Sequence, residues 1–266
     1  FFNASWLADG SGRVLGNETK NLAIGIEDFR NPVVNLSADT MGPLDDFLRF
    51  LNESPPISKQ LGSEFARLSA YSGLANVALD LRVPLYDRSA YLLDSMLEIT
   101  DGTLSIKGFG PTIDEINGVL VLQEGNLSGK GIEGMFLEGP ILASVGIADD
   151  PGYFVDISLD GQINIEAIHQ HLNFPFEGYL TGNTRWEGSI LLPSATYTQV
   201  GREPLRISIG STLSGVELGL PEPLSKLPSD PTSLQLDFIF SETDRLDVSG
   251  HLGAMRRFAL SYRNRD

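Results

Sequence analysis

Short runs of alternating apolar and polar residues constrain the fold of this chain more than any other feature of its sequence. In a β-strand successive side chains point to opposite faces, so a period of two gives each strand one apolar face. Six runs show this period, and they lie at residues 22–26, 77–83, 155–159, 205–209, 234–240 and 246–248. The sequence therefore predicts a set of half-buried strands, each with one face turned to an apolar interior.

Glycine-containing turn signals predict how these strands connect. They occur at residues 9–10, 101–102, 124–125, 160–161 and 181–183, and such dipeptides are typical of hairpins. Parallel strands would need crossovers of about a dozen residues or more, usually helical. Helical periodicity occurs in only two places, so we expect an all-β fold with one or two short helices and mostly antiparallel wiring.

The two expected helices are residues 43–52 and residues 165–172. In the first, Leu44, Phe47, Leu48 and Leu51 form an i, i+3, i+4, i+7 stripe, and Pro43 suits the first helical position. This stripe predicts a short helix that packs on a sheet. Residues 59–72 fit a loop, a frayed helix or a strand equally and stay unassigned.

Composition limits the class of protein. The 266 residues are 41% hydrophobic and 20% charged, which is typical of a folded soluble body. A net charge of −16 repels nucleic-acid phosphates, so we expect no nucleic-acid partner. No sharp linker divides the chain, so residues 1–266 are expected to form one continuous β-rich segment, and the proline-rich stretch 221–231 is the candidate for a secondary boundary. Because the chain opens on Phe1 without Met, we expect it to be a piece of a longer polypeptide.

The sequence offers little catalytic or metal-binding chemistry. It has no cysteine, and His169 and His171 are two residues apart, which turns their rings to different sides of a helix. Residues 125–131 lack the spacing and the Ser or Thr of a phosphate-binding loop. We therefore expect no catalytic residue, no metal site and no cofactor, and we do not expect an enzyme.

A series of landmarks follows in order along most of the chain. They are IEDFRNP at 26–32, LSADTMGPLDDFLRFLNESP at 36–55, LDLRVPL at 79–85, INGVL at 116–120, GNLS at 125–128, TRWEG at 184–188 and LGLPEPL at 218–224. Their order resembles that of the large YhdP-like proteins of the AsmA superfamily in Gram-negative bacteria.

The resemblance implies both a fold and a function. It implies an elongated antiparallel meander sheet that curls into a long apolar groove, and conduction of phospholipid between the inner and outer membranes. It also implies a periplasmic location, with a tether to the inner membrane in a segment that this chain lacks. The implied partners are phospholipid acyl chains, the remainder of the longer chain and envelope proteins at either end.

Eight residues on the alternating strands are the candidates for lining such a groove. An apolar sheet face can equally be closed against a second sheet, so a β-rich envelope scaffold with a closed core and no lipid cargo remains the alternative. The candidate lipid-groove residues are Leu79, Leu81, Ile157, Leu159, Ile207, Ile209, Leu236 and Phe238.

Overall fold

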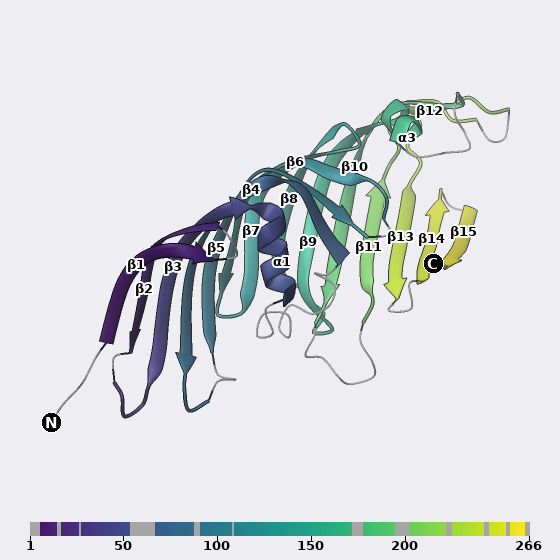
Figure 1. Ribbon diagram of the computed structural model, residues 1–266. Coiled ribbons are helices and arrows are strands. Elements are labelled where there is room, and N and C mark those ends of the chain that lie inside the picture. The colour runs from purple at the N-terminus through teal and green to yellow at the C-terminus, as the bar shows by residue number, and fades with distance from the viewer. Residues whose placement is uncertain are drawn as a thin grey trace.

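The computed structural model describes residues 6–14, 17–26, 28–53, 67–87, 91–107, 109–171, 178–194, 203–221, 225–241, 245–253 and 256–263. Within this part of the chain, fifteen strands form one sheet, accompanied by two short helices (Figure 1). The strands are β1 (Trp6–Val14), β2 (Asn17–Ile26), β3 (Val33–Pro43), β4 (Leu68–Pro84), β5 (Leu92–Ile106), β6 (Thr112–Gln123), β7 (Asn126–Phe136), β8 (Gly139–Ile147), β9 (Tyr153–Asn164), β10 (Leu180–Pro193), β11 (Leu205–Ser211), β12 (Val216–Leu218), β13 (Leu234–Ser241), β14 (Arg245–Leu252) and β15 (Arg256–Arg263), and the helices are α1 (Leu44–Glu53) and α3 (Ile165–His171).

The sheet is an antiparallel meander in which nearly every strand pairs with the next strand along the chain. β12 is the exception, because it pairs with β10 outside the main path and leaves β11 to pair directly with β13. The main path begins at β1 and ends at β15, so the sheet is open and not a closed barrel. The prediction of an all-β, elongated antiparallel meander is therefore confirmed.

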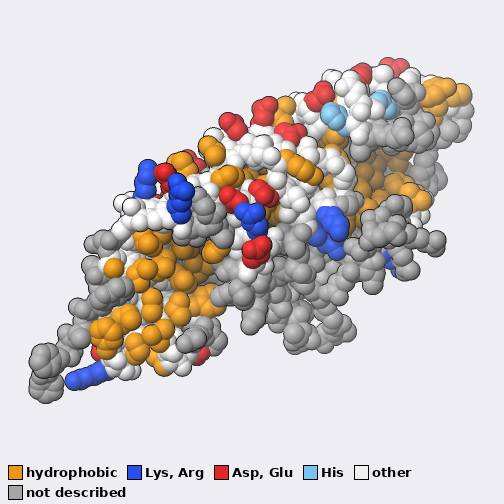
Figure 2. Space-filling view, in the orientation of Figure 1, with side chains coloured by type: hydrophobic (Ala, Val, Ile, Leu, Met, Phe, Trp, Pro, Cys, Tyr) orange, Lys and Arg blue, Asp and Glu red, His pale blue; other side chains and the backbone are white. Residues whose placement is uncertain are grey.

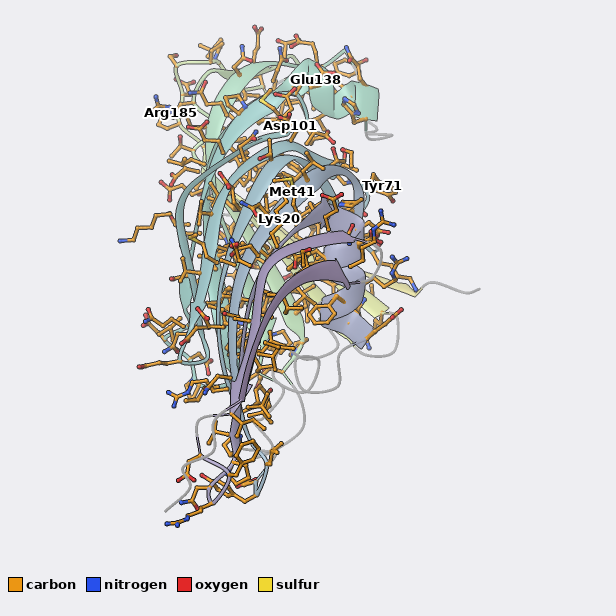
Figure 3. All side chains as sticks on the ribbon, turned by 60° about the vertical axis from the view of Figure 1, so that its left-hand side comes forward. Lys20, Met41, Tyr71, Asp101, Glu138 and Arg185 are labelled. Carbon is orange, nitrogen blue, oxygen red and sulfur yellow. The ribbon has the colours of Figure 1, made fainter. Side chains whose placement is uncertain are left out.

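The sheet is curved along its whole length, with α1 on its concave side. In Figure 3 the strands form an arched wall that has α1 under the arch, while Arg185 lies on the opposite, convex side. All six alternating runs identified in the sequence lie inside strands, in β2, β4, β9, β11, β13 and β14. Their apolar side chains turn toward the concave side.

Three neighbouring strands bend at one level of the sheet. Gly73 in β4, Asp101 in β5 and Glu115 in β6 all have positive φ angles, of 107°, 50° and 52°. The registers of the β4–β5 and β5–β6 pairs shift at the same level. A Cβ atom on Gly73 would lie only 2.6 Å from the Cα atom of Gly102, so the close approach at this bend requires glycine.

Beyond this bend the first residues of β4 and the last residues of β5, which pair with each other, cross the concave face and reach β13. Figure 1 shows these two segments passing in front of later strands of the sheet. The guanidinium of Arg67, just before β4, lies 6.0 Å from the ring centroid of Phe240 on β13. The bend therefore turns part of the sheet into a cover over its own centre.

Helix α1 matches its prediction to within one residue at each end. Pro43 is the last residue of β3, where it pairs with Leu74, so the helix begins at Leu44 instead. Leu44 and Leu48 are buried, and Leu44 contacts the concave face beside Ile99. Asp45 and Asp46 occupy the first turn, where negative charge suits the helix dipole.

The second predicted helix forms, and part of the unassigned segment 59–72 is a strand. α3 (Ile165–His171) confirms the helix predicted over 165–172, with residue 172 outside the described residues. Residues 68–72 of the unassigned segment belong to β4, whereas 59–66 lie outside the described residues.

In the proline-rich stretch, Lys226 pairs with Leu218 in an isolated bridge, and its Nζ donates to the carbonyl oxygens of Val216 and Leu227. The secondary boundary expected there stays a prediction.

Four of the five predicted hairpin turns are wrong. Only residues 124–125 form a turn, between β6 and β7, while the signals at 9–10, 101–102, 160–161 and 181–183 lie inside strands. Glycine within a strand often marks a bulge, a bend or a close packing contact. At Gly161 the reason is visible, because the Trp186 ring lies over it and a Cβ there would come within 2.6 Å of the indole.

Candidate apolar groove

Cross-strand pairing aligns apolar side chains into continuous rows along the concave face. From β8 to β15 each member of one row pairs directly with the next: Val145, Ile157, Ile190, Ile207, Phe238, Val248 and Leu260. On the other side of the centre, Val77, Leu97 and Leu120 form the same kind of row across β4, β5 and β6. Because directly paired residues share a face, these rows make one apolar surface along the sheet.

All eight candidate groove residues lie on this concave face. Ile157, Ile207 and Phe238 belong to the row just described. The adjacent row holds the next three, Leu159, Ile209 and Leu236, on β9, β11 and β13. Leu79 and Leu81 lie on β4 at the other end of the sheet, where Leu81 pairs with Leu36 and Leu93.

The eight residues differ in how far they are covered. Ile207 and Leu159 are buried, with 2% and 8% of their surface exposed. The other six, Leu79 and Leu81 among them, are half-buried. The face is therefore sealed near its centre and more open toward both ends.

Four aromatic rings seal the centre. Phe109, between β5 and β6, lies edge-on to Phe238 of β13 with centroids 5.5 Å apart, and stacks on Phe136 of β7 at 6.1 Å. Phe136 in turn lies 5.7 Å from Trp186 of β10. We call Phe109, Phe136, Trp186 and Phe238 the aromatic cluster. It joins the cover formed by β4 and β5 to the floor formed by β7, β10 and β13.

Two sections of the apolar face are left uncovered on either side of the aromatic cluster. Figure 2 shows a broad hydrophobic surface at its lower left, over the lower parts of the first strands, and a second hydrophobic area toward the upper right. At the C-terminal end, Leu260 is 68% and Phe258 41% exposed, although both pair within the apolar rows. We call the first surface, which includes Leu79 and Leu81 of β4, the N-terminal open section, and the second, which includes Phe258 and Leu260 of β15, the C-terminal open section.

The opposite, convex face carries acidic side chains in β7, β9 and β10. Residues alternating with the apolar rows form a shallow hollow of about 870 Å³, whose lining includes Glu133, Asp160, Arg185 and Glu187. Asp160 and Glu187 are directly paired across β9 and β10. Like charges in that position repel each other. In this region the sheet thus places these carboxylates on the side opposite the apolar rows.

The perturbed titratable groups are scattered over separate places. Burial raises the pKa of Tyr153, and the nearby Arg206 opposes this shift. Burial lowers the pKa of Lys226, while hydrogen bonds from Ser261 and Arg245 lower the pKa of Asp247. These groups lie at the start of β9, in the proline-rich stretch and on β14, so they form no common site.

The described residues contain neither a group of metal ligands nor a helix that could span a membrane. In the described part of the chain, no three histidine, aspartate or glutamate side chains gather as they would around a metal ion. His171 Nε2 contacts Glu138 Oε1 at 3.1 Å, whereas His169 Nε2 faces the carbonyl of Leu180, so the two rings point to different partners. Neither of the two described helices has the length and apolarity that crossing a bilayer requires.

Sequence reasoning missed the residues that seal the centre. Phe109 lies between strands and has no periodicity to mark it, and Trp186 stands between two charged residues. The signal on β8 was weak, because the buried residues Ile141, Ala143 and Val145 alternate with Ser144 but also with the apolar Leu142. Only the fold-over of β4 and β5 reveals that Phe109 belongs to the apolar face.

The chain was compared with known families, curated proteins and solved structures. Neither the curated proteins nor the solved structures gave a match. The family described as YhdP protein matches residues 6–265, which is nearly the whole chain. The chain therefore belongs to the YhdP family and is an envelope protein of the AsmA-like type.

Proposed function

We propose that this chain is a segment of a periplasmic bridge that conducts phospholipid between the inner and outer membranes along its concave apolar face. The observation that carries the proposal is the continuous apolar row from Val145 to Leu260, which crosses seven consecutive paired strands. Acyl chains are the ligands of this face. The rest of the longer chain and envelope proteins at its ends are the other partners, and no residue has a catalytic role.

The energy of moving a lipid supports a path of this kind. Each methylene exposed to water costs about 0.8 kcal/mol, so releasing a sixteen-carbon chain costs on the order of 12 kcal/mol. A continuous apolar surface removes most of that barrier at every point of the path. The apolar rows provide aliphatic contacts, whereas the carboxylates Glu133, Asp160 and Glu187 project from the other face.

A closed scaffold is the second candidate, and the sealed centre favours it. Val155 is fully buried and Ile207 nearly so, as in an ordinary core. A scaffold would use the concave face only to hold the fold together. The two candidates therefore differ in whether lipid contacts the open sections.

Photo-crosslinking tests the proposal directly. A photoreactive amino acid replaces Leu81 in the N-terminal open section or Leu236 on β13, in the protein as it is expressed in cells. Matched controls carry the same amino acid at Arg82 and Gln235, one residue along the same strands and on the convex face. Captured molecules are identified by mass spectrometry after purification without detergent.

The proposal expects phospholipid at Leu81 and Leu236 and none at the two control positions. Equal capture on both faces would indicate nonspecific contact with membranes. No lipid at any position would reject the lipid path and leave the scaffold.

A further inference from the structure

The aromatic cluster lies on the concave face between the two open sections, where its rings contact one another. Phe109 is its one member that comes from the cover, because Phe136, Trp186 and Phe238 belong to strands of the floor. It contacts two of these three rings directly. Removing Phe109 would therefore take away the contact of the cover with the aromatic cluster without removing any floor residue.

The sealed groove residues lie under this cluster. Ile207 pairs directly with Phe238, the ring that Phe109 contacts edge-on. Leu159 lies beside Gly188, and the Trp186 ring covers that glycine. Both buried residues are thus immediate neighbours of members of the aromatic cluster.

The cluster also contains a buried polar group. The indole Nε1 of Trp186 is buried, and it has no hydrogen-bond partner. A buried donor without an acceptor costs stability, so an apolar side chain would pack better at this position. Trp186 itself is only 7% exposed.

We infer that Phe109 is the constriction residue of the groove, the side chain that limits passage of acyl chains between the N-terminal and C-terminal open sections. This inference rests on the proposed function. An acyl chain passing the centre must displace the Phe109 ring from Phe238 and Phe136, and it then runs against Trp186. The side chain at position 109 consequently sets how readily lipid reaches the centre.

The two tryptophans of the chain make the test specific. They are Trp6 and Trp186, so Trp6→Phe leaves Trp186, inside the aromatic cluster, as the single tryptophan, and excitation at its red edge avoids the tyrosines. Vesicles of phosphatidylcholine carrying brominated acyl chains are added, because bromine quenches indole fluorescence only at near contact. In the Trp6→Phe background, Phe109→Ala is expected to at least double the quenching of Trp186.

Two further variants separate passage from loss of structure. Phe109→Leu keeps an apolar side chain of similar volume and is expected to return quenching toward the parent level. Phe29→Ala removes an exposed aromatic, 51% accessible and far from the cluster in sequence, and is expected to change nothing. Urea denaturation of each variant, followed by circular dichroism, identifies any that has lost its fold.

The outcomes distinguish this inference from the proposed function. If Leu81 captures lipid but Phe109→Ala leaves quenching unchanged, or if Trp186 is already fully quenched in the parent, the constriction is rejected and the lipid path stands. If neither Leu81 nor Trp186 contacts lipid in any variant, both are rejected. If Phe109→Leu quenches as strongly as a folded Phe109→Ala, the size of the side chain is not what limits passage, and the inference fails.

Discussion

The unequal burial of the groove residues predicts that the same substitution will have opposite outcomes at two positions. Ile207→Asp places a carboxylate at a site that is 2% exposed and is paired with the apolar residues Ile190 and Phe238. Leu81→Asp places the same group in the N-terminal open section, where the side chain is half-buried. The first variant should fail to fold, and the second should fold.

The magnitudes follow from burial. Losing the buried isoleucine costs about 1.5–3 kcal/mol, and an unpaired carboxyl group in an apolar site adds several kcal/mol whether it stays charged or takes up a proton. The total is comparable with the whole stability of a typical domain, about 5–15 kcal/mol. At Leu81 only part of the apolar contact is lost and the carboxylate reaches water, so the expected cost is about 1–2 kcal/mol.

Urea denaturation followed by circular dichroism measures both effects. Ile207→Ala is the size control and should cost about 2–5 kcal/mol, so that the remainder of the Ile207→Asp effect is due to the carboxyl group. Leu81→Asn separates charge from polarity at the open position. A folded Ile207→Asp with near-parent stability, or an unfolded Leu81→Asp, would refute the division into a sealed centre and open sections.

Four further predictions concern the rest of the chain. Leu48→Ala should lower the free energy of unfolding by about 2–5 kcal/mol, measured by urea denaturation, because the side chain is buried between α1 and the sheet. Glu187→Gln should raise stability by a few tenths to about 1 kcal/mol by relieving repulsion from Asp160, and added salt should shrink that gain. Since hydrogen bonds hold the pKa of Asp247 below its ordinary value, its contribution is present at neutral pH and is lost as pH falls through the lowered pKa; Asp247→Asn and the parent should therefore converge in stability in acid. A chelator should leave the melting temperature unchanged, and a fall restored by one specific metal would reveal a site that was missed.

Local pattern was sufficient for the strands and for the class of fold. Alternation in runs such as 77–83 and 234–240 identified both the strand and the side chains that face the concave surface, because a period of two has one geometric meaning. The stripe of Leu44, Phe47, Leu48 and Leu51 identified α1 for the same reason. Where one face is buried, hydrophobic pattern and register support each other.

Bends and long-range contacts could not be predicted from the sequence. The pair at 101–102 looks like a hairpin turn, yet in the structure it marks the level at which β4, β5 and β6 fold over. A glycine signal is the same for a turn, a bulge and a packing contact, so sequence alone cannot choose among them. The cover that brings Phe109 onto Phe238 depends on that choice, which is why the sealed centre was not foreseen.

The pairing register of the strands determines which face of the sheet carries the carboxylates and which carries the apolar side chains. In β9 and β10, Asp160 pairs with Glu187 on one face, while the neighbouring residues Leu159 and Gly188 pair on the other. A slip of one residue in either strand would bring a carboxylate onto the concave face and carry an apolar side chain to the convex face. A net charge of −16 and a continuous apolar surface are compatible only because every strand keeps its register. The packing of Trp186 over Gly161 and Gly188 helps to fix that register, since a side chain at either glycine would collide with the indole ring.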